Sequence, residues 1–579
     1  MKKSEKRSII DLIATYALDF FTVLIILSIA LSYSAVTLHS PIAFGDEGFY
    51  SSTGEWIAQH MEFPKYYPYI GTDYIKLPAA RLPMGFINTA FFSALFGETG
   101  IKIMMPFFIA LSALLVYFTF RGLRKQILGF FIALAIMCLP ACVKYGVLNY
   151  PENQAIFYII AAACFFLKGI ENKDTKWFIV AGIMQAFACL SDVIGFFSLP
   201  AYMLWLLSER FKGFTKILPI FIIPLIFIVP WMIRNYALYD APCIPALLPS
   251  EKCKDTFLKP VEKNIFRAKT HRPEISTGAG LFKFGIINFL LFGFGFIGII
   301  AVVSAGAFAG FRDRLNLFFT LWLLIAIAIV LYLAMRNPRT EDLLRYSLFA
   351  IFPVAYFAGR FIESVFEKSK TSRFTLKILF TTSLVIPLSL FIIFVKGNML
   401  AGIMIFITYL FFLPLTELAE GRKPMHSIYL ALTIILVFAV LYSGIGELLN
   451  MYRVKHNLDP LVDACKWVRE HTPENATITL VYAHPAEYNC KRRIFSIQGL
   501  PEGDAIRLWA NESSYQLLKK WGFDYIMIEG FTMVPKSMYW REAEPLEFVF
   551  YLENSPHFEK VYDNTAKYGP NGIRIYKIK

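Results

Sequence analysis

The chain has 579 residues, of which 56% are hydrophobic and 17% are charged, and its formal net charge is +14. A soluble protein of this length could not bury so much apolar surface, so the composition indicates a polytopic α-helical protein of the cell membrane. Lys and Arg in cytoplasmic loops account for the positive charge, and no basic-aromatic pattern predicts nucleic-acid binding.

The first predicted element is an apolar run from about residue 14 to 38, which follows a basic N-terminus. The run is too long for the hydrophobic part of a signal peptide, so it predicts a membrane anchor whose N-terminus lies in the cytoplasm. A first extracytoplasmic loop, about 39–97, comes next. Its amphipathic stretches at 55–61 and 83–96 suit the membrane interface.

Long apolar runs predict further spans, to a total of about thirteen. Each turn that this topology assigns to the cytoplasm carries Lys or Arg, as the charge bias of membrane proteins requires. The odd number of spans places the C-terminal end outside, and a second large outer loop covers about 234–283. The remaining predicted spans are 99–120, 127–145, 154–166, 177–190, 194–207, 217–233, 286–308, 317–335, 346–361, 376–395, 399–415 and 428–445.

From about residue 448 the composition becomes that of a soluble protein. The predicted domains are a transmembrane domain, 1–447, and a small extracytoplasmic α/β domain, 448–579. The predicted elements of the second domain are a helix at 459–471, strands at 477–482 and 525–528, and a hairpin of 558–562 with 573–578.

Two pairs of cysteines lie in predicted outer segments. Cys243 and Cys253 share the second large loop, and Cys465 and Cys490 share the α/β domain. Two disulfides are therefore possible, with free thiols as the alternative.

Polar residues gather at the predicted outer ends of the spans. Asp46 and Glu47 are adjacent carboxylates directly after the first span, a costly place for charges that serve no function. Other segments supply further polar groups: Lys76, Arg81, Glu152, Asp192, Arg234, Asn235 and Arg345. A mixed cluster of this kind suits a substrate that carries an anion such as a phosphate, together with an acceptor that must be deprotonated or oriented.

Short motifs in this order resemble the GT-C glycosyltransferases, in particular the branch that contains protein O-mannosyltransferases and lipid A aminoarabinose transferases. The motifs are Asp46-Glu47 with Phe49-Tyr50, Tyr74-Ile75-Lys76-Leu77-Pro78, Leu95-Phe96-Gly97, Pro230-Trp231, Arg234-Asn235 and Arg345-Tyr346. The resemblance implies transfer of a sugar from a dolichyl- or undecaprenyl-phosphate donor to a protein, glycan or lipid acceptor. It further implies a reaction at the extracytoplasmic face, with inversion.

The resemblance also implies roles for individual residues. Asp46 would orient or deprotonate the acceptor, with Glu47 in support and Glu152 as a second acidic residue. The donor phosphate would be held by Lys76, Arg234 and Arg345. Further possible substrate contacts are Tyr50, Tyr74, Arg81, Asp192, Asn235 and Tyr346.

The motif after the first span departs from the family pattern, because Ile75 stands where relatives often carry Glu. We therefore expect no metal site in this loop and no certain cofactor, although a divalent cation remains possible.

Other interpretations stay open from the sequence alone. The carboxylates could serve as helix caps, and the cations could extend from the span ends toward the lipid interface. The whole protein could be a transporter or flippase of lipid-linked sugars, or a non-catalytic membrane assembly protein. Asp19, inside the first span, is not explained by any of these interpretations.

Overall fold

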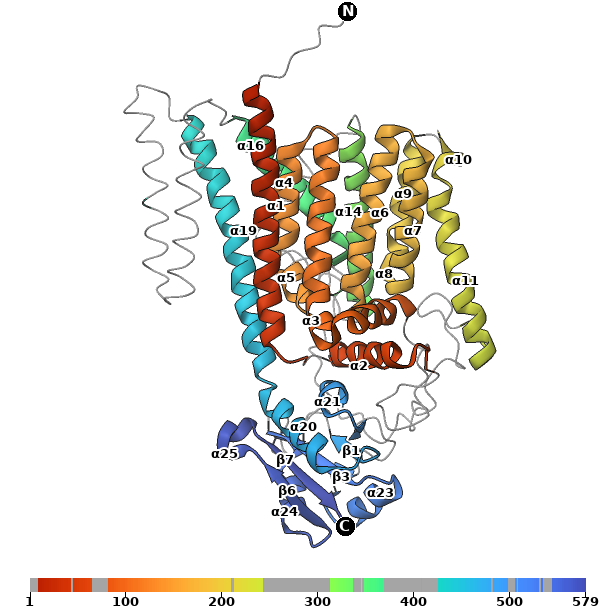
Figure 1. Ribbon diagram of the computed structural model, residues 1–579, viewed down its shortest axis with the longest axis vertical. Helices are drawn as coiled ribbons and strands as arrows, with labels where there is room; N and C mark the ends of the chain where they lie inside the picture. Colours follow the sequence, from red (N-terminus) through yellow and green to blue (C-terminus); the bar gives the residue numbers. More distant parts are fainter. Residues whose placement is uncertain are drawn as a thin grey trace, which may run out of the picture.

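The computed structural model describes most of the transmembrane part and most of the C-terminal part of the chain. The described residues are 9–42, 45–64, 82–209, 213–242, 313–336, 345, 348–368, 408, 425–480, 483–497, 506–507, 509–530, 533–534 and 544–579. Helices run side by side in a bundle, and an α/β module lies beyond one end of it, while the helix that begins at Ile9 starts at the other end (Figure 1).

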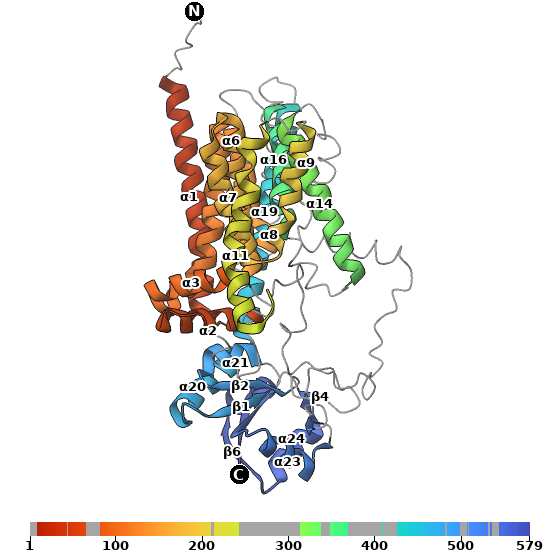
Figure 2. The same ribbon diagram turned by 90° about the vertical axis from the view of Figure 1, so that its right-hand side faces the viewer.

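The bundle is made of apolar helices of unequal length (Figures 1 and 2). Buried aromatic and aliphatic side chains from these helices form one continuous core. The helices are α1 (Ile9–His39), α3 (Pro83–Gly122), α4 (Gln126–Cys138), α5 (Pro140–Gly146), α6 (Pro151–Asn172), α7 (Thr175–Ser191), α8 (Ile194–Phe197), α9 (Leu199–Ser208), α10 (Phe214–Ile217), α11 (Pro219–Tyr239), α14 (Arg314–Arg336), η5 (Leu348–Ala350), α16 (Ile351–Lys368) and α19 (Met425–His456).

Within the described residues, four stretches of helix are long and apolar enough to cross a membrane, or five if the bent pair α4 and α5 is one span. The four are Leu18–His39, Pro83–Gly122, Pro151–Asn172 and Phe214–Tyr239. A membrane-embedded helical protein is thus confirmed, whereas the total of about thirteen spans stays a prediction. The predicted spans 286–308 and 376–395 lie outside the described residues, as does nearly all of 399–415.

Two described parts of the first predicted loop are helical. Helix α2 (Gly45–His60) lies across the end of the bundle, between the bundle and the α/β module (Figures 1 and 2). The predicted interfacial stretch 83–96 and the next span form one helix, α3, which is broken at Gly97 by a φ of 59°, a backbone conformation that glycine adopts readily. Helix α2 packs so closely on α3 that a Cβ atom at Gly54 would lie 2.5 Å from Cγ2 of Thr89.

Asp19 lies at the bundle end that is remote from α2. Its carboxylate is 2.5 Å from the Arg121 guanidinium and accepts hydrogen bonds from Tyr117 and Gln126 at 2.6 and 2.8 Å. A charge that the sequence left unexplained is therefore neutralised by the basic end of α3.

The α/β module contains a five-stranded sheet in the order β2-β1-β3-β7-β6. The first three of these strands are parallel, and β7 runs antiparallel to its neighbours β3 and β6. Helix α20 (Asp459–His471), both predicted strands and the predicted hairpin are confirmed. The elements are β1 (Thr477–Leu480), α21 (Ala483–Cys490), β2 (Arg493–Ser496), α23 (Glu512–Lys520), β3 (Tyr525–Glu529), β4 (Met533–Val534), β5 (Glu544–Pro545), α24 (Leu546–Asn554), β6 (Phe558–Asp563), α25 (Thr565–Tyr568), η9 (Gly569–Asn571) and β7 (Ile573–Ile578).

One of the two possible disulfides is present. Cys465 in α20 is bonded to Cys490 at the end of α21, whereas Cys243 and Cys253 lie outside the described residues. The bond fixes α21 to the helix that follows the bundle.

Replacing both cysteines of this bond with Ala should lower the stability of the α/β module by about 3 kcal/mol, because the closed loop restricts the unfolded chain. Thermal unfolding of the full-length protein, with and without reductant, measures the effect. Reductant should lower the wild-type midpoint toward that of the double variant. Equal midpoints for the oxidised wild type and the double variant would contradict the prediction.

Candidate active site

Helix α2 begins with the two carboxylates that the sequence singled out. Asp46 and Glu47 lie in its first turn, where the positive end of the helix dipole stabilises negative charge. Their side chains have different partners, so the two adjacent acids have different structural roles.

Arg345 connects Asp46 with Glu152. Its Nη2 atom donates to Oδ2 of Asp46 at 2.9 Å and to Oε1 of Glu152 at 2.6 Å. Glu152 lies in the first turn of α6, so three segments that are far apart in the sequence meet at one guanidinium. The side chains of Asp46 and Arg345 are each 19% exposed, and that of Glu152 is 6% exposed, so the first two remain partly accessible.

The Arg345 guanidinium has further N–H groups that can donate hydrogen bonds to a ligand. Its Nε atom is buried and has no hydrogen-bond partner within the described part of the chain, and its Cζ atom lies over the Tyr150 ring, 4.7 Å from the centroid. Burial lowers the pKa of Arg345, but the charges of Glu152 and Asp46 raise it more, so its pKa stands above the ordinary value. The group is thus a permanent cation with unused hydrogen-bonding capacity, as anion binding requires.

A buried amide network holds the two acidic helices together. The Asn149 side chain donates to Ser51 of α2 and to Thr89 of α3, both at 3.2 Å, and accepts from Gln154 of α6 at 3.1 Å. The network continues through Asn88 to Tyr158, at 2.7 and 2.9 Å. These buried amide and hydroxyl groups form hydrogen bonds with one another, so the network fixes the position of α2 relative to α6. The position of Asp46 relative to Glu152 is fixed with it.

Glu47 has partners other than Arg345, one of them the backbone N–H of Asn149, which donates to its Oε1 atom at 3.5 Å. The same oxygen accepts from Nζ of Lys455 at 2.8 Å, and the Glu47 and Lys455 side chains are 5% and 2% exposed. Lys455 is a residue that the sequence analysis missed. It lies in the last turn of α19, beyond the predicted end of the span at 445, where a basic residue usually signals topology alone.

Arg234 and Asn235 occupy the end of α11. The Arg234 guanidinium donates to the carbonyls of Phe63 and Pro64 at 3.3 and 3.4 Å and lies 4.9 Å from the Trp231 ring. Asn235 is fully buried and donates to the carbonyl of Pro242 at 3.3 Å. Arg234 therefore binds the backbone just before residues 65–81. Its hydrogen bonds go to these carbonyl groups and not to the carboxylates of Asp46 or Glu152.

Two other predicted contacts have structural partners. Asp192 accepts from the backbone N–H of Ile194 at 3.0 Å, at the start of α8. Tyr50 is fully buried, and its ring stacks on Phe86 with centroids 4.7 Å apart, so it packs α2 on α3.

The remaining predicted site residues cannot be placed. Tyr74, Lys76, Arg81 and Tyr346 lie outside the described residues. Within the described part, no three His, Cys, Asp or Glu side chains gather as a metal-ion site, and the possible divalent cation stays a prediction.

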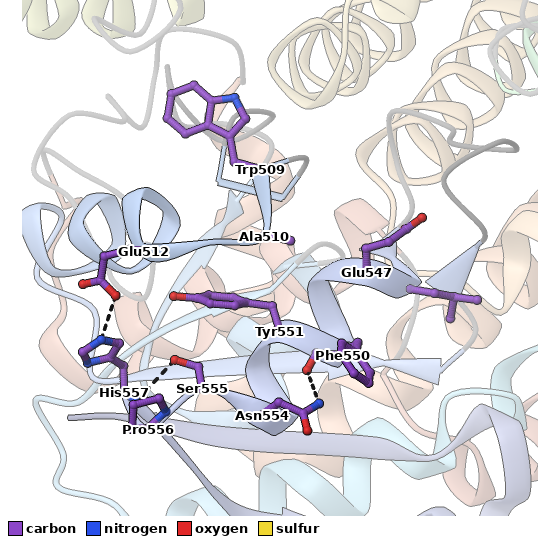
Figure 3. A pocket seen from close by; sticks show the side chains of 11 residues that line it. Trp509, Ala510, Glu512, Glu547, Phe550, Tyr551, Asn554, Ser555, Pro556 and His557 are labelled. Carbon is purple, nitrogen blue, oxygen red and sulfur yellow. Dashed lines mark hydrogen bonds and ion pairs between the residues drawn. The ribbon is translucent and has the colours of Figure 1, made fainter.

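A groove with a volume of about 900 Å³ lies elsewhere, on the α/β module between α23 and α24 (Figure 3). Exposed Trp509 and Phe550 line it, together with His557, whose Nε2 atom is 2.8 Å from the Glu512 carboxylate. Its lining residues fall within 509–557 and include none of the predicted site residues. The groove is therefore separate from the candidate active site.

The comparisons with known proteins agree with this architecture. Residues 78–233, which include α3, α6 and most of α11, match the family model described as dolichyl-phosphate-mannose-protein mannosyltransferase. No curated protein matches the sequence.

Several solved structures share the fold. ArnT from Cupriavidus metallidurans bound to undecaprenyl phosphate is 14% identical, with a TM-score of 0.56 over 96% of this chain and 97% of that one. The oligosaccharyltransferase AglB from Archaeoglobus fulgidus, in complex with an inhibitory peptide and a dolichol-phosphate, is 14% identical, with a TM-score of 0.53 over 87% of this chain and 69% of that one. The arabinofuranosyltransferase AftD from Mycobacteria is 11% identical, with a TM-score of 0.50 over 96% of this chain and 40% of that one.

The fold and the family match together define the class of the protein. The chain is a membrane glycosyltransferase of the GT-C fold. The transporter and assembly-protein interpretations are set aside accordingly.

Proposed function

We propose that the protein transfers a sugar from a polyprenyl-phosphate carrier to a hydroxyl group of a protein, glycan or lipid at the extracytoplasmic face of the membrane. The observation that carries the proposal is the placement of Arg345 between Asp46 and Glu152, at 2.9 and 2.6 Å. A cation for the leaving phosphate and a carboxylate for the acceptor proton are thus held in one place. The complexes of ArnT with undecaprenyl phosphate and of AglB with a dolichol-phosphate support a donor of this class.

The proposed reaction is a single displacement with inversion. The acceptor oxygen attacks the anomeric carbon while Asp46 takes the proton from the acceptor hydroxyl. The bond between the anomeric carbon and the phosphate oxygen breaks, and its electron pair leaves with the polyprenyl phosphate. Arg345, with Lys76 and Arg234 as further candidates, stabilises the negative charge of the leaving group. Glu152 holds the guanidinium in place.

The proposed topology places the N-terminus in the cytoplasm and the α/β module outside. Asp19 lies in the first half of α1, which begins at the bundle end remote from the module, and its partner Arg121 lies in the last turn of α3. Helix α2, which carries Asp46, lies at the end next to the module (Figure 1). A donor could then enter laterally from the lipid while the acceptor arrives from the water outside.

Purified protein in liposomes tests the proposal directly. The assay supplies dolichyl-phosphate mannose or undecaprenyl-phosphate aminoarabinose as donor, together with a mixture of peptide, glycan and lipid acceptors. Mass spectrometry should detect a sugar-bearing acceptor and a free polyprenyl phosphate in equal amounts. Glycans from cells that lack the gene should lack the same sugar. Release of polyprenyl phosphate without a modified acceptor would contradict the proposal.

A further inference from the structure

Helix α2 is attached to the C-terminal part of the chain by a buried ion pair. Lys455 of α19 and Glu47 of α2 are 2.8 Å apart, and their side chains are only 2% and 5% exposed. Removing two charges from water costs several kcal/mol, so such a pair adds little net stability over an apolar contact. A benefit other than stability is therefore expected from it.

A second set of contacts holds the same helix further along. Lys491, directly after α21, pairs with Glu55 of α2, and the Asn489 side chain donates to the carbonyl of Ile42, before α2, at 2.8 Å. Glu47 and Glu55 are about two helical turns apart, so the two ion pairs hold α2 at two separate points along its length. Helix α21 lies next to α2, on the side of the α/β module (Figures 1 and 2).

The elements that make these contacts form one unit. Helix α19 leads into α20, and the Cys465–Cys490 disulfide fixes α21 to α20. Helix α2 is therefore held at two points along its length, by α19 through Glu47 and by the α/β module through Glu55.

We propose that Lys455 is a positioning residue, which acts through Glu47 to orient the first turn of α2 so that the Asp46 carboxylate faces Arg345 and Glu152. Successive helical residues point about 100° apart. With Glu47 fixed toward Lys455, the direction of Asp46 is fixed as well. The inference rests on the proposed function and assigns Glu47 to anchoring, rather than to direct support of the chemistry as the sequence analysis expected.

Kinetics of charge-removal variants test the proposal. The variant Lys455→Gln should lower kcat at least about tenfold per folded protein, because displacement of a reacting group by about 1 Å can cost up to about 100-fold. The KM for the polyprenyl-phosphate sugar should stay within about threefold, since Arg345 is unchanged. The matched control is Arg453→Gln, which removes an exposed cation two residues earlier in α19 and should retain the wild-type kcat.

A neutral pair separates positioning from stability. The double variant Glu47→Met/Lys455→Met leaves no lone buried charge and no hydrogen-bonding group, so it should fold even where Lys455→Gln does not. Its kcat should be reduced as in Lys455→Gln, because the contact between α2 and α19 is broken in both variants. A neutral pair with the wild-type kcat would overturn the proposal, since the ion pair would then serve stability alone.

Exchanging the charges tests the role of Glu47 itself. The variant Glu47→Lys/Lys455→Glu should recover kcat to within about fivefold of the wild type, because it restores the contact between α2 and α19. A folded exchange variant that is as inactive as Asp46→Asn would show that the Glu47 carboxylate takes part in the chemistry, and that result overturns the proposal.

A distance measurement between spin labels tests the positioning role of Lys455 without any measurement of enzyme activity. Spin labels at Met61 and Glu98, which are 85% and 57% exposed, report the position of α2 against α3. The distance distribution should shift or broaden in Lys455→Gln and stay unchanged in Arg453→Gln. An unchanged distribution in Lys455→Gln would overturn the positioning role. Failure of the proposed function is distinct from this, because the wild type itself would then transfer no sugar.

Discussion

Asp46→Asn is expected to lower kcat for sugar transfer by about 10²- to 10⁴-fold, the range that a positioned general base contributes. Asn has almost the same shape as Asp, and its amide oxygen can still accept from Arg345, so the fold and the site geometry should persist. Because Arg345 keeps its partner Glu152, binding of polyprenyl phosphate should change little. Single-turnover kinetics with a labelled donor, together with a lipid-binding assay, measure both quantities.

Glu62→Gln is the matched control for this variant. Glu62 is an exposed carboxylate just after α2, and its neutralisation should leave the rate of transfer unchanged. Transfer by Asp46→Asn within about threefold of the wild type would show that Asp46 does not act as a base, and its role would then be confined to holding Arg345.

Arg345→Gln should be the most damaging substitution in the site, for stability and for activity. It leaves Asp46 and Glu152 facing one another without the cation that joins them, at a cost of about 3 kcal/mol for a buried pair that loses one partner. The substitution also removes the guanidinium N–H groups that would bind the phosphate of the polyprenyl-phosphate sugar. Thermal unfolding in detergent and the KM for the donor measure the two effects.

A triple variant separates these two effects. In Asp46→Asn/Glu152→Gln/Arg345→Gln the carboxylates are neutral, so the repulsion disappears and the unfolding midpoint should return toward that of the wild type. Binding of polyprenyl phosphate should remain weak. Restored binding in the triple variant would show that Arg345 only neutralises the acids and does not hold the donor.

Local signals in the sequence predicted the elements well where periodicity and charge decide the structure. The amphipathic pattern of 459–471 corresponds to α20, and the two strand patterns near the C-terminus pair as β6 and β7. The break at Gly97 was not predicted, because the helical pattern of 83–96 and that of the following span each looked complete. The φ of 59° at Gly97 lets the two pieces join as one bent helix.

The sequence predicted which polar residues lie at the outer ends of the spans, but not which of them pair with one another. Asp46, Glu152 and Arg345 were all expected at the outer side, and the structure brings them together although Arg345 is 299 residues from Asp46 and 193 from Glu152. Which polar groups would pair could not be read from spacing, because pairing depends on how the bundle packs. Arg234 illustrates this, since it binds backbone carbonyls instead of a carboxylate.

Lys455 shows the limit of sequence reasoning most clearly. Basic residues after a span are usually topology signals, and Arg453, Lys455 and His456 follow the predicted end of the last span. Only the extension of α19 to His456 brings Lys455 against Glu47, 408 residues away, where it becomes buried. The sequence offered no way to distinguish Lys455 from exposed Arg453.

The most direct measurement is an experimental structure of the protein with bound polyprenyl phosphate. The account predicts that the phosphate oxygens lie within about 3 Å of the Arg345 guanidinium nitrogens, and that the Asp46 carboxylate faces the space next to that phosphate. A phosphate bound elsewhere, with Arg345 engaged by Asp46 and Glu152 alone, would contradict it.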